Sequence, residues 1–198
     1  MPTTLKITKN NILDAAFNIV RESGIESVSN REIAKKLNSS IRPIYYQFKN
    51  VDELKAELYS KMEKYFYDYI IENIIDDVPK YKQIGINYIK FARDEKNLFK
   101  VLFMSEFDYA PKKFISKEEN DFNRVMKFAK NSTRLSDNKI EDFHVKMWLF
   151  THGIATLVAT KTIKFTDDEI KQLLSQEFQA LMLLEQNPNN PWIIRKGD

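Results

Sequence analysis

Cysteine is absent from the 198-residue sequence, and glycine is scarce, with only four residues. The lack of cysteine excludes disulfides, thiolate catalysis and cysteine-based zinc sites, and it is typical of proteins from a reducing compartment. So few glycines argue against a turn-rich β-fold. Neither GxGxxG nor GxxxxGK[ST] occurs in the sequence, which excludes phosphate-cradling loops of those two kinds.

Long hydrophobic runs are also missing. The longest stretch without a formal charge runs from Met147 to Thr160, which is shorter than the roughly 18 to 20 apolar residues that a membrane span needs. The N-terminal segment MPTTLKITKNN lacks the apolar run and the cleavage site of a signal peptide. We interpret the uncharged stretch as a buried helix and expect a cytoplasmic protein without membrane contacts.

The charge is modest in amount but uneven in placement. The net charge is +3, and residues 1–49 hold eight basic and four acidic side chains, whereas the remaining residues hold 23 basic and 24 acidic ones. The positive excess therefore lies in the first quarter of the chain, a distribution that suits a polyanionic partner for this segment.

Apolar residues recur at three- and four-residue steps almost everywhere, which predicts an all-α protein. Together with the cap signals, this periodicity predicts helices over residues 8–23, 29–38, 41–49, 51–75, 79–95, 98–106, 116–131, 138–162 and 166–186. The chain length permits one sizeable domain, or a small domain joined to a medium one. We place an N-terminal domain at residues 1–50, a connecting helix at about 51–75, and a helical body at 76–198.

The first three predicted helices are separated by clear stop and start signals. Gly24 is a natural C-terminal stop, and Ser29 with Glu32 forms the S-x-x-E pattern of a capping box. Asn38 can adopt the left-handed conformation after the second helix, and Ser40 can cap the third. Three short helices, with only a few residues between the second and the third, are the signature of a helix-turn-helix.

Further starts are marked in the same way. The cap-like pairs are Asn50 with Glu53, Ser116 with Glu119, and Thr166 with Glu169. In the third helix Ile44 and Phe48 are one turn apart and predict a buried face, whereas the other side chains of that helix fall on its remaining faces. The alternative that Tyr45 also belongs to the core is left open.

The segment ILDAAFNIVRESGIESVSNREIAKKLNSSIRPIYYQFKNVDEL, residues 12–54, resembles the TetR family of bacterial transcriptional regulators of the TetR/AcrR type. It contains an Ala-Ala first helix, a glycine after it, R-x-IA-x-x-L, and Y-x-x-F-x-N-x-x-x-L, in order and at the family's spacing. Three positions depart from the pattern, namely Ser39, Arg42 and Pro43. The resemblance implies a homodimer, with a helix-turn-helix and a six-helix ligand-binding body in each subunit.

A helix of this kind fits the major groove of double-stranded DNA. The candidate DNA-binding residues are Arg31, Ser40, Ile41, Arg42, Pro43, Tyr45, Tyr46, Gln47 and Lys49. We expect Arg42 and then Arg31 to read guanine, and Gln47 to read adenine or bind phosphate. Ile41 and Pro43 would contact thymine methyls, whereas Tyr45, Tyr46 and Lys49 would bind phosphates. The partner implied is a palindromic operator, and Ser29 and Thr8 are further backbone-contact candidates.

The helical body is rich in aromatic residues, most of which we expect in the core. A pocket for a small apolar or amphipathic effector is predicted around Tyr88, Phe91, Phe103, Met104, Phe107, Trp148 and His152. His144 and His152 lie two helical turns apart, about 12 Å, which is too far to hold one metal ion. We therefore expect no metal site and no cofactor, and interpret the histidines as satisfied core or interface residues.

The last two helices are the expected dimer surface. The candidate residues are Gly153, Thr156, Thr160, Leu174, Phe178 and Leu181, which combine a small-residue stripe with an apolar ridge. Gly153 could instead relieve a contact within one chain, and the sequence leaves both readings open.

The resemblance implies a ligand-responsive regulator, and from the family we expect a repressor that a small-molecule effector releases from its operator. An enzyme is the less favoured reading, because no nucleophile–base pair stands at a recognisable spacing. A third reading is a helical binding module, or a protein that binds DNA without sequence preference and without effector control.

Overall fold

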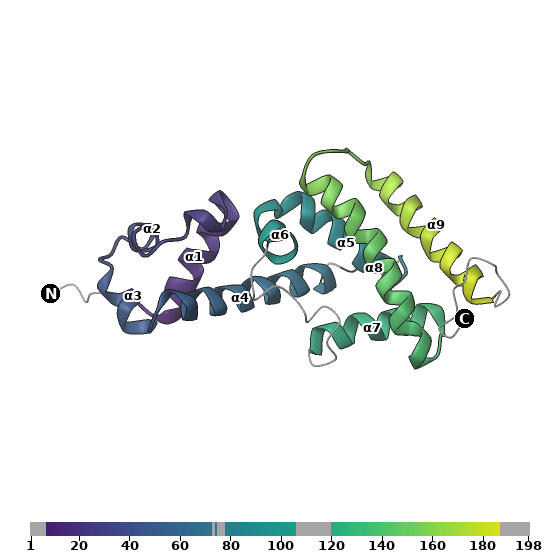
Figure 1. Ribbon diagram of the computed structural model, residues 1–198, viewed down its shortest axis with the longest axis horizontal. Helices are drawn as coiled ribbons and strands as arrows, with labels where there is room; N and C mark the ends of the chain where they lie inside the picture. Colours follow the sequence, from purple (N-terminus) through teal and green to yellow (C-terminus); the bar gives the residue numbers. More distant parts are fainter. Residues whose placement is uncertain (1–6, 73, 75–77, 106–119, 187–198) are drawn as a thin grey trace, which may run out of the picture. The chain divides into compact units, whose positions relative to one another are not determined.

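All the regular secondary structure in the described part of the chain is helical. The computed structural model describes residues 7–72, 74, 78–105 and 120–186 (Figure 1). Nine α-helices and one short 3-10 helix, Ile25–Ser27, lie in these residues, which contain no strand. The α-helices are α1 (Lys9–Ser23), α2 (Asn30–Lys36), α3 (Arg42–Gln47), α4 (Val51–Glu72), α5 (Lys80–Asp94), α6 (Lys96–Phe103), α7 (Asn120–Thr133), α8 (Asp137–Ala159) and α9 (Asp167–Gln186). The predicted all-α class is confirmed.

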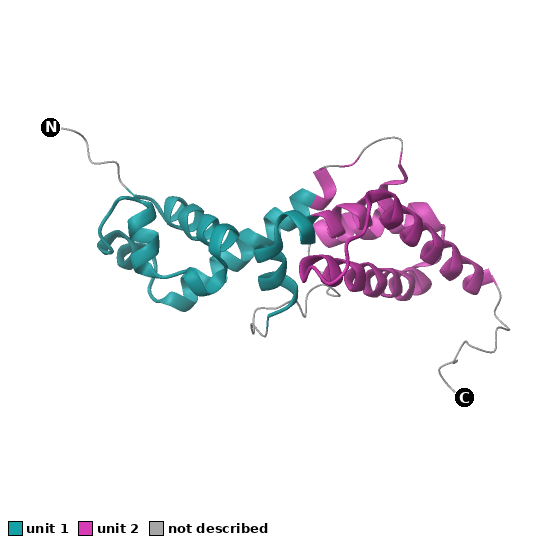
Figure 2. Cartoon of the chain, turned by 90° about the horizontal axis from the view of Figure 1, so that it is seen from above, with its two compact units in different colours: residues 1–69, 91–116 teal, residues 70–90, 117–198 magenta. Residues whose placement is uncertain are grey.

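The chain divides into two compact units. Unit 1 comprises residues 1–69 and 91–116, and unit 2 comprises residues 70–90 and 117–198 (Figure 2). The boundaries between them fall within α4 and α5, so α6 belongs to the same unit as the N-terminal helices. The predicted boundary after residue 50 marks the end of the helices expected to bind DNA. The compact units are divided differently, because unit 1 combines α1 to α3 with most of α4 and with α6. None of the described helices is both long and apolar enough to cross a membrane.

Local chemistry fixes both ends of α1. At its start the Thr8 hydroxyl accepts the Asn11 N–H at 3.2 Å, and Asn11 Oδ1 accepts the Thr8 N–H at 3.0 Å. This is a capping box with asparagine in the place of the usual glutamate, and the sequence pattern did not reveal it. At its end Gly24 has φ +85° and donates its N–H to the Val20 carbonyl at 2.9 Å. The predicted glycine stop is therefore confirmed.

The start of α2 and its connection to α3 confirm one of the predicted cap signals and correct two. Asn38 takes the left-handed conformation with φ 49°, as expected. The Ser29 hydroxyl accepts the Glu32 N–H at 3.2 Å, but the Glu32 carboxylate pairs with Lys35 Nζ at 3.7 Å, so the box forms only in half. Ser40 does not cap α3, because the chain is already helical at Ile41, which is the N-cap residue and makes no side-chain bond.

Apolar side chains of α1, α4 and α6 form the core of unit 1. Phe17 of α1 meets Tyr65 of α4 edge to face, with ring centroids 5.1 Å apart. Fully buried members of this core include Ile12, Val20, Leu58, Met62, Phe66, Leu98 and Phe99. These residues recur at helical spacing, so each helix buries one continuous apolar stripe.

Unit 2 is built from α7, α8, α9 and the first part of α5. Gly85 allows α9 to lie close to α5, because a Cβ at this position would be 3.2 Å from Leu174 Cδ1. The buried amide of Asn87 donates to the Ile70 carbonyl at 3.1 Å and accepts from Gln83 at 2.8 Å. Before α9 the predicted Thr166–Glu169 box forms with both of its bonds. The other predicted box, Ser116 with Glu119, lies outside the described residues.

Candidate nucleic-acid interface

Two buried side chains anchor α3 on unit 1. Ile44 is 2% exposed and Phe48 is 3% exposed, as their spacing predicts. Lys9 Nζ, at the start of α1, lies 5.0 Å from the centroid of the Phe48 ring. The turn before α3 is held by the Ser39 N–H, which donates to the Ala34 carbonyl at 2.9 Å. One face of this six-residue helix is thereby fixed, and its other faces are presented to solvent.

The exposed face of α3 carries arginine and tyrosine side chains. Tyr46 is 84% exposed, Tyr45 is 63% exposed, and Arg42 at the first helical position is also exposed. The alternative that Tyr45 belongs to the core is therefore wrong. The Arg42 guanidinium makes no ion pair with the described residues, so it is available to an external acceptor. Ile41, 44% exposed, adds an apolar contact at the same end.

The remaining candidates differ in exposure. Ser40, Lys49 and Arg31 are exposed, and Arg31 follows the first residue of α2. Pro43 and Gln47 are half-buried, so they present less of their surface than the tyrosines. Pro43 lies in the first turn of α3, where the missing amide costs no intrahelical bond. The structure thus brings an arginine, two tyrosines and an isoleucine together on one exposed surface.

Glu53 connects the end of α3 to the start of α4, a role that the sequence reading missed. Its carboxylate accepts the Lys49 N–H at 2.7 Å, and its own N–H donates to Asn50 Oδ1 at 2.8 Å. Lys9 pairs with Glu53 at 3.6 Å and also with Glu57. The bond from the Lys49 backbone lowers the pKa of Glu53, and the bond to Glu57 raises the pKa of Lys9. The sequence signal that could have indicated this role is the three-residue spacing of Asn50 and Glu53.

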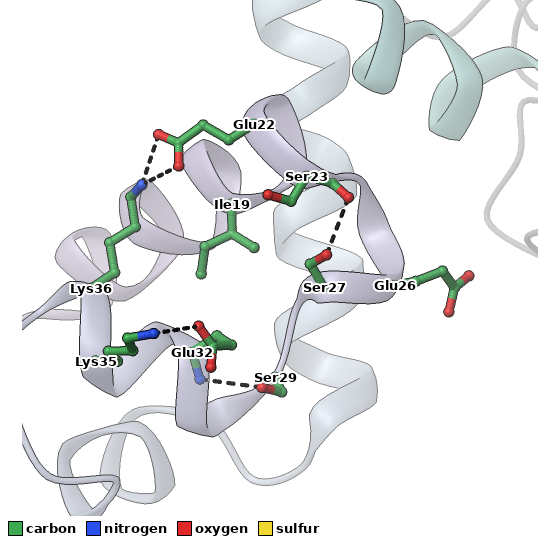
Figure 3. Close-up of a pocket in the computed structure, with 9 residues that line it drawn as sticks. All are labelled: Ile19, Glu22, Ser23, Glu26, Ser27, Ser29, Glu32, Lys35 and Lys36. Carbon is green, nitrogen blue, oxygen red and sulfur yellow. Dashed lines mark hydrogen bonds and ion pairs between the residues drawn. The ribbon is translucent and has the colours of Figure 1, made fainter.

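A cleft of about 650 Å³ lies in unit 1 between α1, the 3-10 helix and α2 (Figure 3). Its lining residues are Ile19, Glu22, Ser23, Glu26, Ser27, Ser29, Glu32, Lys35 and Lys36. Lys36 pairs with Glu22 at 2.8 Å, and the Ser27 hydroxyl donates to the Ser23 carbonyl at 3.1 Å. Because these polar groups bond one another, the cleft has few groups left to orient a ligand.

Three of the predicted effector residues meet in unit 2. The Tyr88 hydroxyl lies 3.0 Å from Nδ1 of His152, and the Trp148 ring stacks on the His152 ring with centroids 5.2 Å apart. Burial lowers the pKa of His152. His144 is bonded in a similar way, with its Nδ1 2.9 Å from the Tyr81 hydroxyl. Each histidine therefore pairs with a tyrosine of α5, which agrees with the reading of both as satisfied residues.

The other predicted effector residues lie in unit 1 or outside the described segments. Phe91 is fully buried, and its ring lies 5.1 Å from that of Phe66. Phe103 also meets Phe66, at 5.0 Å, whereas Met104 is 42% exposed. Phe107 lies outside the described residues. Phe91 and Phe103 therefore share the aromatic core of unit 1.

The predicted dimer residues of unit 2 separate into buried and exposed groups. Leu174 and Leu181 are 2% and 7% exposed, so both are packed within their own chain. Phe178 is half-buried and meets Phe143 edge to face at 5.4 Å. Gly153 on α8 and Thr160, the residue after α8, are exposed, and Thr156 is half-buried. Within the described ranges no group of three or more histidine, cysteine or acidic residues could hold a metal ion.

Comparison with known proteins agrees with this geometry. Residues 12–58 match the family described as bacterial regulatory proteins, tetR family. A TetR family protein from Vibrio parahaemolyticus has TM-score 0.60 at 19% identity, over 87% of this chain and 97% of its own. A TetR-family transcriptional regulator from Haemophilus influenzae has TM-score 0.63 at 18% identity, over 87% and 94%. No curated protein sequence matches the chain. At these identities the two solved structures show a shared fold.

The short turn between α2 and α3, and the exposed face of α3, define a helix-turn-helix protein with a helical body. The matched segment covers most of α1, all of α2 and α3, and the start of α4. Residues 12–58 are thus similar to the N-terminal domain of the bacterial regulatory proteins of the tetR family, and the rest of the chain shares the fold of solved regulators of that family.

Proposed function

We propose that the protein is a homodimeric repressor that a small-molecule effector releases from a palindromic operator. The observation that carries the proposal is the surface of α3, where Arg42, Tyr45 and Tyr46 are exposed over a buried base of Ile44 and Phe48. The exposed tyrosines and the arginine, which has no ion pair within the described residues, offer hydrogen-bond donors side by side, and a nucleic acid supplies acceptors on both phosphates and base edges.

Each exposed side chain has a role that fits its chemistry. Arg42 would donate two hydrogen bonds to one guanine, and Arg31 would contact a second base or a nearby phosphate. Tyr45, Tyr46 and Lys49 would bind phosphates and so fix the position of α3 in the groove. The secondary base contacts come from Ile41, Pro43 and Gln47, and Ser40 adds a backbone contact.

Dimerisation through α8 and α9 is supported by an uncharged exposed surface on the second half of α8 and on α9 from Gln172 onward. Every exposed residue of α9 from Gln172 to Leu183 is uncharged, and so is every exposed residue from Met147 to Thr160. Leu149 and Leu183 are 57% and 65% exposed. Depletion of charge with exposed leucine is the composition of an interface core. Two subunits would place two α3 helices in successive major grooves, about 34 Å apart.

Effector control would act through the aromatic cluster of unit 2. Tyr88 and His152 are hydrogen-bonded to each other beside the flat indole surface of Trp148, and an amphipathic small molecule would stack on this surface and exchange that bond for bonds to itself. An effector bound there would favour a conformation whose two heads no longer match the operator. Family members are DNA-binding proteins, and we propose no catalytic activity.

Selection of duplexes from random DNA, followed by gel shift, tests the proposal. We expect Arg42→Ala to cost about 1–3 kcal/mol of binding free energy and to relax base choice, because it removes a base contact. Lys49→Ala should weaken all sequences alike and reduce the salt slope by about 1. Lys127→Ala, at an exposed lysine of α7, is the matched control and should bind as wild type. Equal affinity of the wild type for selected and random duplexes would instead indicate a DNA-binding protein without sequence preference.

Effector control needs a separate measurement. Small amphipathic compounds that raise the melting temperature should also release the selected duplex, and His152→Ala should abolish both effects while leaving DNA affinity unchanged. Compounds that stabilise the protein without releasing DNA would contradict the effector part of the proposal and leave the DNA-binding part standing.

A further inference from the structure

Two side chains from separate helices of unit 1 meet around one buried carboxylate. Glu95, the residue before α6, is 9% exposed. Arg21 of α1 donates from Nε to Glu95 Oε2 at 2.9 Å and from a second nitrogen to Oε1. Tyr65 of α4 donates its hydroxyl to Oε1 at 2.9 Å. The three residues form the Arg21–Tyr65–Glu95 cluster, which joins α1, α4 and α6.

Contacts around the cluster strengthen the same junction. Asn97 of α6 donates its side-chain amide to the Arg21 carbonyl at 2.9 Å, so the last turn of α1 is held through backbone and side chain. The Arg21 guanidinium also lies 5.5 Å from the centroid of the Tyr65 ring. One turn further along α4, Tyr69 donates to Asp94 Oδ2 at 2.9 Å. Two tyrosines of α4 thus bind two consecutive carboxylates at the junction of α5 and α6.

The chemistry of the cluster makes it a rigid link. The paired bonds from an arginine to a carboxylate fix distance and angle together, unlike a single flexible ion pair. Burial, with the bond to Glu95, raises the pKa of Tyr65, so its hydroxyl remains a donor at neutral pH. A movement that separates α1 from α6 would leave the buried Glu95 carboxylate or the Arg21 guanidinium incompletely paired. Because this loss of pairing costs free energy, the cluster opposes such a movement.

We propose that Arg21, Tyr65 and Glu95 are positioning residues that determine which spacing of the two DNA half-sites the protein accepts. The inference rests on the proposed function, because spacing has meaning only for a dimer bound to DNA. α3 packs against α1 and follows it through two short connections, so the direction in which α3 points depends on how α1 is held. One base pair is about 3.4 Å of helix axis, so a small movement of each head changes the half-site spacing that fits.

The experiment measures affinity against a series of duplexes that contain the selected half-site in pairs, with the spacing changed one base pair at a time. A duplex with one half-site reports the contact of a single head. We expect wild type to lose at least about tenfold in affinity for a shift of one base pair, since the two heads must fit successive grooves. Glu95→Gln and Tyr65→Phe should reduce this penalty to below about threefold and leave single half-site affinity within about twofold.

A matched control separates this role from general stability. Asp14→Asn removes the exposed ion pair between Asp14 of α1 and Lys61 of α4, 2.8 Å apart, without touching α6. This variant should keep the wild-type spacing penalty. Tyr65→Phe keeps the ring against Phe17 and removes only the hydroxyl. This variant therefore tests the positioning role even if Glu95→Gln fails to fold.

The outcomes distinguish the two proposals. If both cluster variants retain the wild-type spacing penalty, the positioning role alone is overturned. The same holds if the variants lose affinity equally for every duplex, including the duplex with one half-site. A wild type that selects no duplex overturns the proposed function and the positioning role with it.

Discussion

The hydroxyl of Tyr81 lies 2.9 Å from Nδ1 of His144, and both groups are held in the interior of unit 2. The Phe122 ring covers the same imidazole, with centroids 5.7 Å apart. Burial lowers the pKa of His144 to about 4 and raises that of Tyr81. Both side chains are therefore neutral in the folded protein at physiological pH.

This pair predicts loss of stability in mild acid. The unfolded chain binds a proton at His144 below about pH 6.5, whereas the folded chain binds it only near pH 4. The free energy of unfolding should therefore fall as the pH drops through this window, by up to about 3 kcal/mol from this group. Urea unfolding of wild type and His144→Gln at several pH values measures the difference, because the glutamine cannot take up the proton. Parallel curves for the two proteins would contradict the prediction.

Two helical glycines predict opposite effects of a larger side chain. Gly85 lies under Leu174, so Gly85→Val should crowd the junction of α5 and α9 and destabilise unit 2 by about 1–3 kcal/mol. Gly153 on α8 has open space where its Cβ would be. Gly153→Ala should stabilise the helix by about 0.5–1 kcal/mol, because alanine loses less backbone entropy on folding. Thermal unfolding of both variants checks the contrast. A stable Gly85→Val protein would show that Leu174 moves aside easily.

Most of the fold of the N-terminal helices could be predicted because its signals are local. Gly24, Asn38, Ile44 and Phe48 each have a conformation or burial that follows from neighbours within a turn or two. The exposure of Tyr45 could not be settled from spacing, since it depends on how α3 lies on the rest of unit 1.

Tertiary packing explains what the sequence could not predict. Leu174 and Leu181 have the spacing of an apolar ridge, but spacing does not say whether a ridge meets its own chain or a partner. The Arg21–Glu95 pair is separated by 74 residues, so no periodic pattern connects its members. Half of the Ser29–Glu32 box was lost to Lys35, a competing partner one turn away.

We expect DNA affinity to depend on Glu53, although this residue need not contact DNA. Glu53→Ala frees the Lys49 N–H and one partner of Lys9, so the end of α3 should be held less firmly and affinity for the selected duplex should fall several-fold. Glu57→Ala is the matched control, since Glu57 also pairs with Lys9 but makes no contact with Lys49. Gel shift of the two variants, with circular dichroism to verify folding, gives the comparison. Equal losses would assign the effect to Lys9 rather than to the turn.

The exposed leucines of α8 and α9 predict a charge-sensitive dimer. Leu149→Glu or Leu183→Glu would place a carboxylate in an uncharged surface, where association would have to remove it from water without a partner. Sedimentation velocity should show the dimer dissociation constant rising by at least about tenfold, the usual effect of a change at the centre of an interface. Lys127→Glu makes an equally drastic change on α7 and should leave the dimer intact. Binding to a duplex with one half-site should survive in the leucine variants, because α3 lies in unit 1, whereas the gain in affinity from a second half-site should disappear. If both leucine variants remain dimers at micromolar concentration, the interface lies elsewhere on the chain.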